Sequence, residues 1–208
     1  MLELSGLYYP NRIARYFFLA MDDVMGPNGL NVVLSLAGLD RYIGTLPPDD
    51  LVKQFDFAAM ASLNYALEEM YGVRGGRGMA LRVGRASFSQ GFRHFGAFSG
   101  VSHPAFQSLS LEERCGLGLR TLADIFTTFT DQPSSITVSD TGYLFTVETS
   151  PMAWGRMSDK PVCHALVGIL QECLRWVSNG HEFHVHETEC LACGDGQCVF
   201  KINSTPIG

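Results

Sequence analysis

Lysine is scarce in this sequence: Lys53, Lys160 and Lys201 are the only three in 208 residues. No cluster of Lys and Arg occurs along the chain, and the formal net charge is −6, from 15 basic and 21 acidic residues. Proteins that bind nucleic acid neutralise its phosphates with grouped basic side chains. The sequence therefore argues against nucleic acid as the main partner.

Long apolar runs are also missing. A membrane-spanning helix needs roughly 18–20 apolar residues, and the stretch YFFLAMDDVMG is interrupted by Asp22 and Asp23. The N-terminus, MLELSGLYYP, has no basic region followed by an apolar one, so it does not resemble a signal peptide. We therefore expect a cytoplasmic chain without a membrane span. In that reducing compartment, cysteines serve as thiols or metal ligands rather than as disulfides.

Apolar residues, by contrast, are plentiful. Hydrophobic residues make up 46% of the chain, charged residues only 17%, and there are 14 phenylalanines. A chain of this length buries well over half of its unfolded surface, roughly 70%. The composition is that of a globular protein with a substantial core.

The hydrophobic spacing changes period along the chain. Helical spacing is followed by alternation typical of strands. The expected helices span 10–26, 30–43, 55–72, 112–131 and 161–180, and the expected strands span 135–140, 142–150, 182–190 and 197–202. The glycine-rich stretch 73–98 fits no nucleotide-binding loop and is interpreted as a turn leading into an apolar helix.

Helices followed by antiparallel strands indicate an α+β fold with an antiparallel β-sheet packed on helices. We place a domain boundary near residues 45–50. Residues 1–47 would be an N-terminal helical extension that could serve dimerisation, and residues 48–208 the main domain.

The richest cluster of metal-binding residue types is HETECLACGDGQC, residues 186–198. Zinc takes four tetrahedral ligands drawn from thiolate, imidazole and carboxylate. Cys190, Cys193 and Cys198 flank a glycine-containing turn that lets sulfurs on its two sides converge. A fourth ligand could come from Cys163, where the start of a helix favours a thiolate. Three buried thiols without a metal, or a catalytic thiol, are less favoured alternatives.

Other potential ligands and thiols stand near this cluster or apart from it. Glu187 and His186 precede Cys190 by three and four residues. Cys173, on an apolar helix face, and the isolated Cys115 are predicted to be small core residues. Four protein ligands would leave zinc no open position, so the expected role of the metal is structural.

The C-terminal segment resembles the 4-vinyl reductase domain family. The matching motifs are YLFTVETSP at 143–151, PVC at 161–163, VGIL with Gly168, ETEC at 187–190, CGDGQC at 193–198 and the VFKI that follows. That family includes bacteriochlorophyll 4-vinyl reductase-like proteins, hydrocarbon-binding proteins and the sensor domains of phenol-responsive activators. The resemblance implies a fold similar to that of a trafficking-tether subunit: an antiparallel sheet against helices, enclosing an apolar cavity, usually as a homodimer.

The resemblance also implies a zinc site. By similarity to the phenol sensors, the ligands would be Cys163, Glu187, Cys190 and Cys198, with Cys193 left unused. Spacing alone would instead use Cys193. We follow the family pattern there.

Aromatic side chains are the expected lining of the cavity. The candidates to contact a hydrophobic ligand are Phe88, Phe92, His94, Phe95, Phe98, Tyr143, Phe145 and Trp154. His94 or His103 could supply a polar contact, or an axial ligand to a magnesium tetrapyrrole. Most single phenylalanines are simply core residues, so a packed core is the competing interpretation.

The sequence leaves three functions open. The preferred one is a non-enzymatic sensor or carrier that binds a tetrapyrrole, chlorophyll precursor or aromatic hydrocarbon in a zinc-stabilised domain. The second is a 4-vinyl reductase acting on divinyl (bacterio)chlorophyllide, which would need a reductant for which no dinucleotide motif is present. The third is a protein–protein adaptor.

Overall fold

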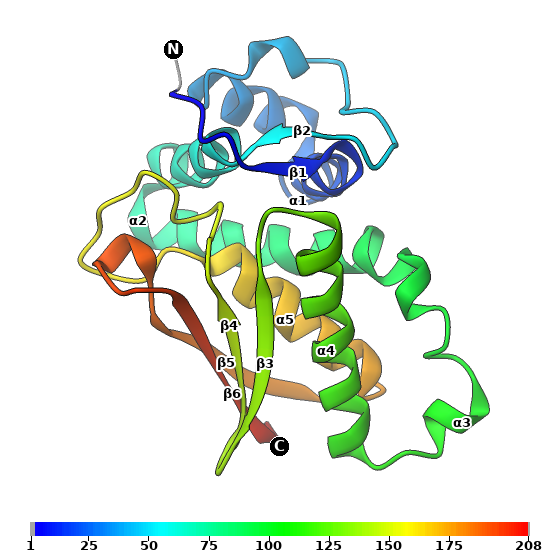
Figure 1. The fold of residues 1–208 in the computed structure, drawn as a ribbon. Helices are drawn as coiled ribbons and strands as arrows, with labels where there is room; N and C mark the ends of the chain where they lie inside the picture. Colours follow the sequence, from blue (N-terminus) through cyan, green and yellow to red (C-terminus); the bar gives the residue numbers. More distant parts are fainter. Residues whose placement is uncertain (1–2, 208) are drawn as a thin grey trace.

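The computed structural model describes residues 3–207 and has two layers of different composition. The upper layer in Figure 1 contains α1 (Asn11–Leu36), the 3-10 turn η1 (Asp40–Tyr42) and a small antiparallel pair of strands, β1 (Tyr8–Pro10) and β2 (Lys53–Asp56). The long helix α2 (Phe57–Gln90) runs from this layer into the lower one. It packs against both α1 and α5 (His164–Val177).

Both long helices change direction at a glycine. Gly26 in α1 and Gly72 in α2 have φ of 75° and 71°, which an L side chain rarely adopts. The helical ends predicted at these two positions are therefore present, but each interruption is a single residue. A new helical segment starts immediately at Pro27, because proline suits the first turn of a helix.

The small β1–β2 pair is a feature that hydrophobic spacing does not predict. The sequence pattern indicates that residues 53–56 lead from a loop into a helix, whereas they form β2, and α2 begins at Phe57. Asp56 caps α2 by accepting a hydrogen bond from the backbone N–H of Ala58 at 2.7 Å. The same carboxylate accepts a hydrogen bond from the backbone N–H of Ser5 at 3.0 Å.

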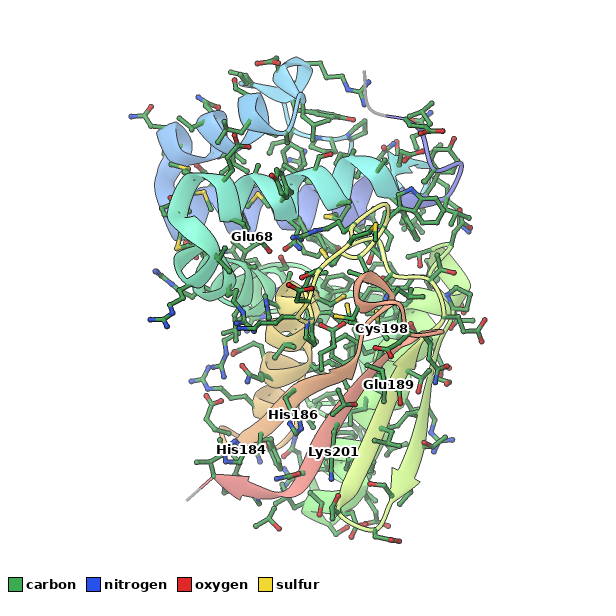
Figure 2. All side chains as sticks on the ribbon, turned by 90° about the vertical axis from the view of Figure 1, so that its left-hand side faces the viewer. Glu68, His184, His186, Glu189, Cys198 and Lys201 are labelled. Atoms are coloured by element: carbon green, nitrogen blue, oxygen red, sulfur yellow. The ribbon has the colours of Figure 1, made fainter. Side chains whose placement is uncertain are left out.

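A four-stranded antiparallel sheet forms the lower layer, in the order β3-β4-β6-β5. Its strands are β3 (Ser134–Ser139), β4 (Gly142–Val147), β5 (Glu182–Glu189) and β6 (Cys198–Ile207). The predicted antiparallel sheet packed on helices is thus confirmed. In Figure 1 the sheet is seen edge-on, with α4 (Leu111–Phe129) and α5 on one of its faces; Figure 2 shows the other face.

Short helical pieces complete the described chain. They are η2 (Phe92–His94), η3 (Gly96–Phe98), α3 (Pro104–Gln107) and η4 (Leu191–Cys193). No helix within residues 3–207 is long and apolar enough to cross a membrane.

One hydrophobic core runs through both layers. Its buried members extend from Tyr9 and Ile13 near the N-terminus to Phe200 and Ile202 in β6. β1 also pairs with β2 across the boundary suggested near residue 47. The division into residues 1–47 and 48–208 stays a prediction.

Candidate metal centre

Four side chains from three separate segments converge at the upper end of the sheet. They belong to Cys163, Glu187, Cys190 and Cys198, and their potential ligand atoms all lie within 4.8 Å of one another. Cys163 precedes the first turn of α5, Glu187 belongs to β5, Cys190 follows that strand, and Cys198 opens β6. This group is called the metal cluster below.

Local backbone features bring the metal cluster together. The pairing of β5 with β6 is irregular between Glu187 and Glu189, immediately before Cys190. The turn that follows is closed by a hydrogen bond from the Cys193 N–H to the Cys190 carbonyl at 2.8 Å. It exits through Gly194, whose φ of 93° is left-handed. The glycine predicted to tighten this turn does so at 194.

Sulfur spacing distinguishes a metal site from a disulfide. The Sγ atoms of Cys163 and Cys198 are 3.7 Å apart, whereas a disulfide bond is about 2.05 Å long. Two sulfurs about 2.3 Å from a tetrahedral zinc ion lie roughly 3.8 Å apart. All six cysteines are free thiols. The spacing therefore fits two thiolates on one ion.

Glu187 supplies an oxygen that the protein leaves without a partner. Its Oε2 atom accepts a hydrogen bond from the backbone N–H of Cys163 at 2.9 Å, while Oε1 is buried and has no hydrogen-bond partner among the described residues. Leaving a buried carboxylate oxygen unsatisfied is costly. A bound cation would satisfy it, so the residues present fit a metal with three sulfur ligands and one oxygen ligand.

Burial makes these groups hard to ionise when no cation is present. It raises the pKa of Glu187 to about 8 and the pKa of the Cys163 thiol well above its ordinary value. Hydrogen bonds from Cys163 and Cys198 instead lower the pKa of Cys190, which is therefore the thiol that ionises first. A divalent cation would reverse the cost of ionising the other groups.

The remaining candidate ligands lie outside the cluster. Cys193 is exposed and does not join the four converging groups, as the family pattern implied. His186 is exposed and pairs in register with Lys201 on the outer face of the sheet, where Figure 2 shows both. Cys115 and Cys173 are buried in the hydrophobic core, as predicted. Burial raises the pKa of Cys115 to about 11.

The segment between β4 and α5 is tied to the metal cluster at several points. The Ser150 hydroxyl lies 3.2 Å from Cys163 Sγ, and Cys163 itself ends the segment. The backbone N–H of Ser158 donates to the carbonyl of Ala192 in the cysteine turn at 2.8 Å. Asn64 of α2 donates to the carbonyl of Val162 at 3.0 Å. The contacts of Ser150 and Asn64 could not be found from the sequence, because they join positions far apart in the chain.

An open groove lies between the two layers and uses this segment as one wall. It has a volume of about 1180 Å³ and is lined by the end of α1, the start of α2 and residues 154–157. Trp154 and Tyr65 contribute aromatic rings to the groove. The guanidinium of Arg156 lies 5.7 Å from the centre of the Tyr65 ring, within the range of a cation–π contact. It also forms an ion pair of 2.8 Å with Glu68.

Most predicted cavity residues are instead packed against other aromatic rings. Phe88 contacts Phe98, and Phe92 contacts Phe126. Phe95 packs on Phe129. These residues are buried in the core together with Tyr143 and Phe145, apart from the half-buried Phe129. Their role as ligand contacts stays a prediction.

Trp154 and the histidines differ from that group. Trp154 is the one predicted contact that lines the groove described above. His94 is exposed and accepts a hydrogen bond from Arg93, and His103 is exposed at the start of α3. Neither imidazole reaches the interior. The groove residues Tyr65 and Arg156 were missed, because nothing in the sequence separates an exposed helical tyrosine or a loop arginine from ordinary surface residues.

Known structures share this fold at low sequence identity. The phenol-responsive sensory domain of the transcription activator PoxR, solved with phenol, aligns with a TM-score of 0.54 and 18% identity over 73% of this chain and 77% of that one. A protein studied for heme distortion in the H-NOX family aligns with a TM-score of 0.58 and 13% identity over 96% and 97%. An H-NOX protein mutant from K. algicida gives 0.54 and 14% over 96% and 97%.

Sequence comparison is narrower than structural comparison. No curated protein matches the chain. A family model, however, matches the segment that carries β4, α5, β5 and most of β6, including every residue of the metal cluster. The resemblance to the 4-vinyl reductase family is thereby confirmed for this part of the chain: residues 144–204 match the vinyl-4-reductase domain.

Proposed function

We propose that this chain is a sensor or carrier domain that binds a hydrophobic small molecule and is stabilised by a structural zinc ion. Cys163, Glu187, Cys190 and Cys198 would hold the zinc. The metal would supply a rigid link between the cysteine turn and the start of α5, and no open position for chemistry. The six free thiols fit a reducing compartment such as the cytoplasm.

The observation that carries this proposal is the shared segment between the metal cluster and the groove. Residues 154–157 form a groove wall, and the same segment is held by Ser150, Ser158 and Cys163 at the metal cluster. A bound metal would therefore fix the position of Trp154. Aromatic and aliphatic walls with few charges suit an apolar or aromatic ligand.

The comparisons support the ligand class. The vinyl-4-reductase domain match and the PoxR structure with phenol favour an aromatic molecule, and the heme of the H-NOX relative favours a larger planar one. An aromatic hydrocarbon or a tetrapyrrole such as a chlorophyll precursor is the proposed ligand, and we propose a homodimer as the working assembly. The interior aromatic residues Phe88, Phe92, Phe95, Tyr143 and Phe145 stay candidate contacts for a ligand that displaces their packing.

Native mass spectrometry of the intact protein from its own cells tests the proposal. We expect one zinc and one organic ligand per chain. Tyr65→Ala should release the organic ligand, because its exposed ring lines the groove, while Tyr71→Ala on the same helix should retain it. Zinc without any organic ligand in the wild-type protein would contradict the binding function.

A further inference from the structure

The two edges of the four-stranded sheet differ in how they are protected. Edge strands expose unpaired backbone groups, and proteins normally blunt them with charge, proline or bulges. β5 has two irregularities in its pairing and carries Glu182, Glu187 and Glu189. β3, at the other edge, pairs with β4 in continuous register and contains no charged residue, proline or glycine. The β3 edge is therefore open to another strand.

Alternation along β3 shows which backbone groups face outward. The N–H and C=O of Ser134 both bond to the hydroxyl of Thr127 in α4, so they point away from β4. Because the direction alternates along a strand, the backbone groups of Ile136 and Val138 point the same way. Among residues 3–207, no hydrogen bond outside the sheet ladders involves the backbone of either residue. Two donors and two acceptors are thus available at this edge.

The residues of this edge read alike in both directions. Residues 135–139 are Ser-Ile-Thr-Val-Ser, with a hydroxyl residue at each end, a β-branched apolar residue inside each end and Thr137 at the centre. In an antiparallel pair centred on Thr137, Ser135 would face Ser139 and Ile136 would face Val138. The outward-facing backbone groups of Ile136 and Val138 would then be opposite one another, as a hydrogen-bonded pair requires.

We propose that β3 pairs with β3 of a second copy of this chain about a two-fold axis at Thr137, joining two four-stranded sheets into one of eight strands. A two-fold interface uses the same patch on both subunits, which the symmetry of residues 135–139 provides. Val138 is 74% exposed in the single chain and would gain the partner's Ile136 as an apolar neighbour. The strand order places β3 at the edge of the sheet, and α4 lies along one face of that sheet (Figure 1). The interface rests on the homodimer of the proposed function and not on its ligand or zinc.

Cysteine cross-linking locates the axis. In this register the two Thr137 Cα atoms form a non-hydrogen-bonded pair about 4.5 Å apart, which is within disulfide range. Thr137→Cys, in a Cys193→Ser background that removes the exposed native thiol, should give mostly cross-linked dimer under mild oxidation. Ser135→Cys in the same background is the matched control, because its two copies would lie roughly 13 Å apart, four strand residues out of register. Equal cross-linking of both variants would overturn the proposed register.

Solution mass separates failure of the interface from failure of the dimer. We expect light scattering to give twice the chain mass for the wild-type protein. Val138→Lys should halve that mass, because lysine protects an edge strand, and Val73→Lys, at a similarly exposed site on α2, should not. A wild-type dimer that survives Val138→Lys would contradict the β3 interface and leave the homodimer standing. A wild-type monomer would contradict both. Circular dichroism should show that each variant is folded.

Discussion

At the scale of single residues, chemistry alone predicted most of the metal cluster. The C-x2-C spacing and the cysteine that follows identified Cys190 and Cys198 and suggested Cys163, and the family pattern added Glu187 and removed Cys193. The structure brings together the four residues that the pattern selects and leaves Cys193 exposed. Spacing could not exclude Cys193, because the direction in which a turn residue points depends on backbone angles such as φ at Gly194.

Replacing single cysteines should separate the metal ligands from the bystander. Cys190→Ser removes a thiolate from the centre of the cluster, so the protein should lose its zinc and its thermal midpoint should fall, because binding of a structural metal adds directly to folding stability. Cys193→Ser should keep both zinc and midpoint. Elemental analysis and thermal unfolding of the two variants measure this. Equal zinc retention by both would show that Cys190 is not a ligand.

The cap of α2 should give stability a distinct dependence on pH. Burial alone would raise the pKa of Asp56, but hydrogen bonds from the backbone N–H groups of Ser5 and Ala58 lower it below its ordinary value of 3.8. A lowered pKa means that the ionised carboxylate stabilises the fold above about pH 3.8, and that this contribution is lost as pH falls through the folded pKa.

Asp56→Asn tests that contribution. At neutral pH it should cost about 1 kcal/mol of unfolding free energy, in the range of helix caps, and the difference from wild type should shrink as pH falls below 3.8. Urea unfolding at several pH values measures it, with the exposed Asp124→Asn as control. A difference that stays constant down to low pH would contradict the assigned role.

At the scale of elements, periodicity predicted the long helices and the four strands of the sheet, because each has a distinct buried face. It missed β1 and β2, which are three and four residues long and too short to show alternation. It also could not show that Gly26 and Gly72 redirect helices that continue beyond them. These outcomes depend on the left-handed conformation at one residue, which the hydrophobic pattern does not encode.

The crossing of α2 and α5 depends on two glycines in contact with the opposite backbone. A Cβ atom at Gly84 would collide with the carbonyl of Ala165, and one at Gly168 with the carbonyl of Leu81. Gly84→Ala should therefore destabilise the fold by roughly 1–3 kcal/mol, as overpacking does.

Gly78 offers a matched control on the same helix. A Cβ atom there would meet nothing within 4 Å, so Gly78→Ala should stabilise the protein by up to about 1 kcal/mol through helix propensity. Denaturant unfolding compares the two variants. A neutral Gly84→Ala would contradict the close approach of α2 and α5.

At the scale of the whole molecule, the metal cluster connects the sheet, α5 and the groove. Removing zinc with a chelator should loosen the segment between β4 and α5, because Ser150, Ser158 and Cys163 all lose their fixed anchor. Hydrogen exchange should then show faster exchange at residues 150–163 than at the α2–α5 crossing. Unchanged exchange in that segment would show that the metal does not hold the groove wall.

Zinc K-edge X-ray absorption on the purified protein tests the central claim most directly. We predict one zinc per chain with three sulfur neighbours at about 2.3 Å and one oxygen neighbour at about 2.0–2.2 Å, supplied by the three buried cysteines and Glu187. A shell of four sulfurs would place Cys193 in the site, and a shell with imidazole nitrogen would place His186 there. Either result, or a protein without zinc, would contradict the account.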